Sequence, residues 1–177
     1  PLAGVFHYSG IVIAFLIRAI ATKGALFSAV TFFCYMPSFF GALTIAYKNF
    51  LFRVAIPLLC MILFCMHPVG QQAIPYTFYW LIPIALYSFK RNSFFAIALS
   101  ATFVTHAVGS VIWLYTKSLP SSVWLGLILV VFFERLLAAC LMTGFYYAAQ
   151  LLVMHARRFY KVLFCKKNYV KKEVHGA

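Results

Sequence analysis

The sequence predicts an all-α, polytopic membrane protein in which about six transmembrane helices form one compact bundle. The 177-residue chain is 65% hydrophobic and 10% charged, with a mean hydropathy of +0.96, whereas soluble domains are about 45–50% apolar and about 25% charged. The apolar residues fall into six segments. Their total number is close to the number that six spans of about 20 residues require. None of the segments alternates between apolar and polar residues as a barrel strand does, so helices are favoured.

The predicted helices are bounded by polar or turn-forming residues, and they cover residues 2–21, 24–47, 50–66, 73–89, 93–115 and 122–154. Residues 67–72 form the clearest predicted loop, because proline and glycine interrupt regular structure and two glutamines favour water. Pro75 and Pro83 are expected to disturb the fourth helix. Residues 155–177 form a basic tail.

The charge distribution predicts the orientation. Fifteen Lys and Arg face two acidic residues, for a net charge of +13, and cytoplasmic loops of membrane proteins are enriched in basic residues. This explains the charge better than binding of nucleic acid, because the chain offers almost no soluble surface. With six spans we expect a multi-pass protein of the bacterial inner membrane with both termini in the cytoplasm. Eleven cations then lie inside, namely Lys48, Arg53, Lys90, Arg91, Arg157, Arg158, Lys161, Lys166, Lys167, Lys171 and Lys172.

The sequence contains no motif for catalysis, metal binding or nucleotide binding. It has no HExxH pair, no Walker motif and no CxxC spacing among its five cysteines, and two acids cannot form a magnesium cage. We therefore predict no catalytic residues, no enzymatic activity, no cofactor and no metal. Because the chain begins with Pro1 rather than Met, we expect a fragment or a processed chain.

The strongest functional signal is the charged pair Glu134-Arg135, near the middle of the sixth predicted helix. Each charge costs about 2.5–3.5 kcal/mol at such a position, so each should be buried and paired. Adjacent residues on a helix point about 100° apart, so we expect that the two charges do not simply cancel each other and that each finds a partner on another helix or in a watered cavity. Thr102 and His106 share one face of the fifth helix, and His106 lies within about 3 Å of the depth of Glu134. The pair is either a structural clamp or part of a functional site.

The fourth predicted helix carries aromatic residues in its outer half. Tyr and Trp at that depth form either an aromatic belt at the lipid headgroups or a wall on which a flat ligand stacks. Together the fourth, fifth and sixth helices predict a small-molecule pocket, and the candidate ligand-binding residues are Tyr76, Tyr79, Trp80, Thr102, His106, Glu134 and Arg135.

Small residues four apart, Ala21, Ala25 and Ala29, would line one helix face and allow another helix to approach closely. With six helices in about 20 kDa, both termini inside, no nucleotide site and polar or aromatic residues on helices four to six, the chain resembles the substrate-binding S-component of energy-coupling-factor transporters. The resemblance implies a vitamin-like solute, a transmembrane coupling subunit that docks on the alanine face, and partner ATPases. Two alternatives remain open: a structural or assembly membrane protein without a ligand, and an unrecognised intramembrane enzyme with His106 and Glu134 as acid and base.

Overall fold

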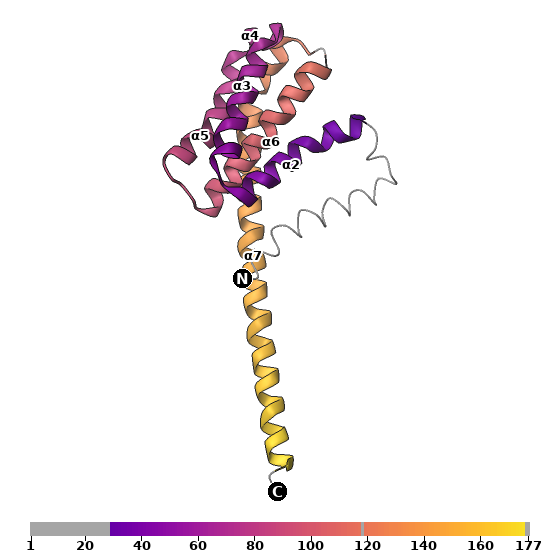
Figure 1. The fold of residues 1–177 in the computed structure, drawn as a ribbon, viewed down its shortest axis with the longest axis vertical. Coiled ribbons are helices and arrows are strands. Elements are labelled where there is room, and N and C mark those ends of the chain that lie inside the picture. The colour runs from indigo at the N-terminus through magenta and orange to yellow at the C-terminus, as the bar shows by residue number, and fades with distance from the viewer. Residues whose placement is uncertain (1–28, 118, 176–177) are drawn as a thin grey trace. The chain divides into compact units, whose positions relative to one another are not determined.

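The computed structural model describes residues 29–117 and 119–175, which are helical apart from short links and contain no β-strand (Figure 1). The all-α class is therefore confirmed for these residues. The predicted helix 2–21 and the start of the next, residues 24–28, lie outside the described residues. The elements are α2 (Ala29–Tyr47), η2 (Leu51–Ala55), α3 (Ile56–Met66), α4 (Pro68–Gln72), η3 (Ile74–Trp80), α5 (Leu81–Ser88), α6 (Phe94–Thr116) and α7 (Ser121–His175).

The third and fourth predicted helices are each built from two kinds of helix. The segment predicted over residues 50–66 begins as the π-helix η2 and continues as α3, and the segment over 73–89 begins as the 3₁₀-helix η3 and continues as α5. Pro75 lies in the first turn of η3 and Pro83 is the third residue of α5. The missing N–H of proline costs little there, because the first N–H groups of a helix have no partner within it.

The prediction of a loop over residues 67–72 is wrong, because Pro68–Gln72 forms the short helix α4. The Nδ1 atom of His67 accepts the N–H of Val69 at 3.2 Å and caps the first turn. Gly70 permits a close contact with α3, since a Cβ atom at this position would lie 1.8 Å from the carbonyl oxygen of Phe64. Pro68 therefore begins a short helix, and Gly70 allows this helix to pack closely against α3, where the sequence predicted a loop.

Helix α6 is the central element, in contact with α2, η2, α3, η3 and α5. Its contact with α2 is the most extensive and includes a close approach at Gly41. A Cβ atom on Gly41 would lie 2.0 Å from Oγ1 of Thr105 and 3.3 Å from the carbonyl oxygen of Ala101. The absence of a side chain at this position thus sets the spacing of the two helices.

Four aromatic side chains from three parts of the chain form the aromatic core: Phe64, Tyr76, Trp80 and Trp124. Each is at most 3% exposed. The ring of Phe64 lies 5.7 Å from Tyr76, 5.3 Å from Trp80 and 5.4 Å from Trp124, and Tyr76 lies 5.2 Å from Trp124. The edge-to-face arrangement of most of these pairs is the one that the ring quadrupole favours. The aromatic core joins α3, η3 and the first turns of α7.

Arg53 in η2 is fully buried and is held by neutral groups. Its Nη1 donates to Oδ1 of Asn92 at 3.4 Å, its Nη2 donates to the carbonyl of Arg91 at 3.2 Å, and its guanidinium lies 5.6 Å from the ring centre of Tyr87. These contacts fasten the link between α5 and α6 to η2.

The chain divides into two compact units, Pro1–Cys140 and Leu141–Ala177, and the boundary lies within α7. The aromatic core, Arg53 and α6 belong to the first unit. In the second unit α7 continues to His175, beyond the end that the sequence predicts at residue 154. Its apolar side chains are exposed as far as Met154.

Two of the described helical stretches, Phe94–Thr116 and Ser121–Arg158, are long and apolar enough to cross a membrane, and Leu51–Met66 is a shorter apolar one. On α7 the large apolar side chains of Leu129, Phe133 and Leu137 are more than 60% exposed. Soluble proteins seldom expose continuous apolar surface of this extent, so the surface is suited to lipid. Six spans go beyond these findings and stay a prediction.

Candidate ligand pocket

A pocket of about 610 Å³ lies between α6 and the first part of α7, within the first unit. Tyr76 of η3 and the buried Val131 of α7 contribute to its lining. Leu119, Val123 and Leu127 add apolar surface along the α7 side. The remaining lining residues carry most of the chemistry of the pocket, and they are Thr105, His106, Gly109, Ser110, Trp113, Trp124, Glu134 and Arg135.

Three polar side chains form a closed network at the middle of the pocket. The Oη atom of Tyr76 lies 2.7 Å from Nε2 of His106 and 3.3 Å from Oγ of Ser110, and Oγ of Ser110 lies 3.3 Å from the same nitrogen. Residues 106 and 110 are one turn apart on α6, so both face the ring of Tyr76. Because these groups satisfy one another, the network holds the imidazole in a fixed orientation.

Two tryptophans lie near the end of the pocket at the link between α6 and α7. Trp124 is 3% exposed and packs in the aromatic core, whereas Trp113 is 57% exposed. The buried Nε1 of Trp124 has no hydrogen-bond partner among the described residues. Such a buried N–H group costs about 1–3 kcal/mol unless a bound molecule supplies an acceptor.

Glu134 and Arg135 line the opposite end and form an ion pair with each other through Oε1 and Nη2. The expectation that the two charges would not simply cancel each other is therefore wrong, because they pair with each other and not with another helix. The alternative of a watered cavity stays a prediction, since both residues line the pocket. The long Arg135 side chain bends back across the 100° between adjacent positions. Glu134 is 58% exposed and Arg135 is 20% exposed, and the buried Nε of Arg135 has no partner among the described residues.

The structure brings together four of the seven candidate ligand-binding residues, Tyr76, His106, Glu134 and Arg135, in the lining of this pocket. No hydrogen bond joins His106 to Glu134 within the described part of the chain. The hydroxyl of Thr102 lies behind the lining and donates to the carbonyl groups of Leu99, at 2.9 Å, and Arg135, at 3.4 Å.

The other two aromatic candidates do not line the pocket. The hydroxyl of Tyr79 donates to the carbonyl of Ile128 at 2.8 Å, and its ring stacks on Phe103. Trp80 is fully buried in the aromatic core. The expected stacking wall of three aromatic residues is thus present only at Tyr76, and the other two bind α7 and the core.

Trp124 was not predicted as a site residue, although a signal for it exists. Residues 124, 127, 128 and 131 follow the spacing of one helix face, and all are buried or half-buried. Of the three alanines predicted as a docking face, Ala21 and Ala25 lie outside the described residues, and Ala29 is the first residue of α2.

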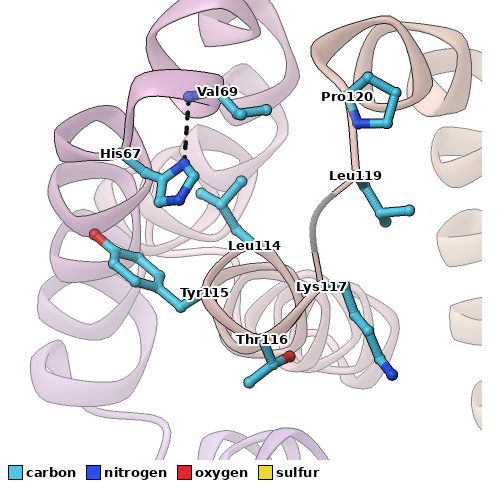
Figure 2. Close-up of a pocket in the computed structure, with 8 residues that line it drawn as sticks. All are labelled: His67, Val69, Leu114, Tyr115, Thr116, Lys117, Leu119 and Pro120. Carbon is cyan, nitrogen blue, oxygen red and sulfur yellow. Dashed lines mark hydrogen bonds between the residues drawn. The ribbon is translucent and has the colours of Figure 1, made fainter.

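A second pocket of about 370 Å³ lies between the start of α4, the end of α6 and the link from α6 to α7, and Figure 2 shows the side chains around it. The ring of His67 faces Tyr115 with 5.1 Å between ring centres. Three of the polar side chains that Figure 2 shows, those of His67, Tyr115 and Thr116, already bind backbone atoms of the fold. Nδ1 of His67 caps α4, the hydroxyl of Tyr115 donates to the carbonyl of Leu63 at 2.9 Å, and that of Thr116 donates to the carbonyl of Ile112 at 2.7 Å.

The two pockets therefore differ in what they offer to a ligand. The larger one has two buried N–H groups without a partner among the described residues at side chains that line it, whereas in the smaller one His67, Tyr115 and Thr116 bind backbone atoms and Lys117 is exposed. Within the described residues, no three His, Cys, Asp or Glu side chains are grouped so that they could hold a metal ion. The larger pocket is suited to binding an organic solute through aromatic and donor groups.

Comparison of the chain with protein-family models, with characterised proteins and with solved structures finds no match.

Proposed function

We propose that this chain is a membrane-embedded subunit that binds a small solute in the pocket between α6 and α7 and works with partner subunits in transport. The observation that supports this most is the pair of unpartnered buried donors, on Trp124 and Arg135, among the residues that line the pocket. Two other buried N–H groups of the described residues, Nε of Arg53 and Nε1 of Trp80, also lack a partner but line neither pocket. What distinguishes Trp124 and Arg135 is that both line a cavity in which a solute could supply the acceptors.

In this proposal the protein spans the bacterial inner membrane about six times, with both termini in the cytoplasm. A solute-binding subunit without a nucleotide site needs energy from elsewhere, so a coupling subunit and ATPases are its expected partners. The alanine face at Ala21, Ala25 and Ala29 is the proposed docking surface for the coupling subunit.

The orientation is tested by labelling at the two ends of α6. Lys90→Cys and Lys117→Cys, each introduced into a chain without its native cysteines, should react with a membrane-impermeant maleimide from opposite sides of the membrane. We expect Lys90→Cys to react only after the cytoplasmic side is opened. Labelling of both from the same side of intact cells would refute the crossing by α6.

Binding is tested on the purified full chain in detergent by a thermal-shift screen against vitamins, amino acids and metal ions. A ligand present at a hundred times its Kd adds about 2.7 kcal/mol to the stability of the folded state. We expect at least one aromatic or anionic solute to raise the melting temperature. Arg135→Gln should lower the affinity for that solute about tenfold, equivalent to about 1.4 kcal/mol.

Lys117→Gln is the matched control, because Lys117 is an exposed cation that lines only the smaller pocket. It should leave binding unchanged. An equal loss of affinity in Arg135→Gln and Lys117→Gln would show that the solute does not bind in the larger pocket. A screen without any stabilising solute would contradict the proposed function.

The second candidate function is a structural or assembly role, and the ion pair between Glu134 and Arg135 favours it, since each residue already has a partner. In that case Arg135→Gln lowers the melting temperature while no solute raises that of the native chain.

A further inference from the structure

The register between α6 and α7 places specific side chains opposite one another along the pocket. The hydroxyl of Thr102 donates to the carbonyl of Arg135, so these two positions lie side by side. Trp113 is eleven residues after Thr102, and Trp124 is eleven residues before Arg135. Because α7 returns antiparallel to α6 after a short link, Trp113 and Trp124 lie at the same level along the two helices, and both line the pocket.

This register gives the pocket a length and two chemically different ends. Eleven residues at 1.5 Å per residue separate the tryptophan end from the Arg135 end by about 16 Å. The α7 side between the ends is apolar, with Leu127 and the buried Val131 in the lining. A compact solute reaches only one end, whereas an elongated solute reaches both.

Each end has one donor that remains to be satisfied. Nε1 of Trp124 and Nε of Arg135 are buried and have no partner among the described residues. Trp113 lines the pocket at the level of Trp124 and is 57% exposed, so its ring is accessible to a ligand. The tryptophan end is therefore suited to a ring that carries a hydrogen-bond acceptor, and the other end to an anionic oxygen.

Glu134 does not block an anion from Arg135. Its carboxylate is 58% exposed, and its one ion-pair partner in the described chain is Arg135 itself. It can turn outward when a ligand oxygen takes its place, and Arg135 retains further N–H donors in its fork.

We propose that the solute is an elongated amphiphilic carboxylate, with an acceptor-bearing ring between Trp113 and Trp124, an apolar middle along α7, and its carboxylate at Arg135. This inference rests on the proposed function, since it specifies the solute of the same pocket.

The test uses a series of ω-benzoyl carboxylates, in which a ring and a ketone are joined to a carboxylate by chains of increasing length. Benzoylformate, 3-benzoylpropionate and 6-benzoylhexanoate are titrated into the purified full chain, together with the neutral 6-benzoylhexanamide and the ringless decanoate. We expect 6-benzoylhexanoate to bind at least about tenfold more tightly than benzoylformate, its amide or decanoate.

Variants at both ends then assign the contacts. Arg135→Gln should weaken binding of 6-benzoylhexanoate about tenfold and leave that of its amide unchanged, whereas the adjacent Glu134→Gln should not weaken it. Trp113→Phe removes no buried contact with the core and should fold, and it should weaken the benzoyl compounds but not decanoate. Trp124→Phe should do the same where it folds.

The outcomes separate the two proposals. Equal affinity for short and long compounds, or binding that is insensitive to Arg135→Gln, overturns the elongated carboxylate. So does a compact vitamin or amino acid that binds in the thermal screen while the whole series fails. Failure of every compound in the series and the screen overturns the proposed function itself.

Discussion

Replacing Tyr76 with Phe removes one hydroxyl from the centre of the pocket and keeps the ring in the aromatic core. The hydroxyl lies 2.7 Å from Nε2 of His106 and 3.3 Å from Oγ of Ser110, so two interactions are lost together. A hydrogen bond contributes about 0.5–1.5 kcal/mol net, and in membrane bundles about 0.6 on average. The side chain is 1% exposed, so water does not replace the lost partner. We expect Tyr76→Phe to lower the free energy of unfolding by about 1–2 kcal/mol.

The measurement is reversible unfolding of the full chain in mixed micelles, followed by tryptophan fluorescence. Tyr115→Phe is the matched control, because the hydroxyl of Tyr115 also makes a hydrogen bond, to the carbonyl of Leu63, but its side chain is 54% exposed. It should cost less than about 0.5 kcal/mol. Combining Tyr76→Phe with Ser110→Ala should give a loss smaller than the sum of the single losses, since both remove the same contact. Equal effects in Tyr76→Phe and Tyr115→Phe, or strict additivity in the double variant, would refute the network.

Three further substitutions and one control, Gly126→Ala, test the packing that positions the pocket, each by the same unfolding measurement. Gly41→Ala should destabilise the chain by about 1–3 kcal/mol, because its Cβ overlaps the α6 hydroxyl it faces. Gly126→Ala, which has open space around it, should be neutral or stabilise by up to about 1 kcal/mol, and equal effects at both glycines would contradict the close approach. Gly70→Ala should cost more than Gly41→Ala, because its Cβ meets a backbone carbonyl that cannot rotate away; a loss below that of Gly41→Ala argues against α4 as described. Asn92→Ala should cost about 1–2 kcal/mol by removing an acceptor from the buried Arg53, and no change would show that the bond is dispensable.

The sequence predicts the long helices well where a local signal marks their ends. The fifth predicted helix, 93–115, corresponds to Phe94–Thr116, because the side chain of Ser93 accepts the N–H of Ala96 and caps its start. The mixed helix types at η2 and η3 were not predicted, since apolar periodicity does not distinguish an α-helix from a π- or 3₁₀-helix. Those types depend on how the segments pack against α6.

Only part of the lining of the larger pocket was predicted from the sequence. Charge in an apolar segment identified Glu134 and Arg135, and a shared face identified His106, because those signals are local. The register between separate helices decides which residues meet. It brings Tyr76 to His106 and Ser110, and it places Trp124 at the level of Trp113. The ion pair between the adjacent residues Glu134 and Arg135 depends on the rotamers of their side chains, and helical geometry alone does not predict those rotamers.

The anchoring of the α5–α6 link by Arg53 has a practical consequence for engineering this protein. That link is bonded, through the Arg91 carbonyl and the Asn92 amide, to a guanidinium 38 residues earlier in the chain. An epitope or a fluorescent fusion inserted there would separate the buried cation from its acceptors. The N-terminal side of α7 is the better place to insert foreign sequence, because the one side-chain hydrogen bond of Ser121 within the described residues goes to the exposed Gln72.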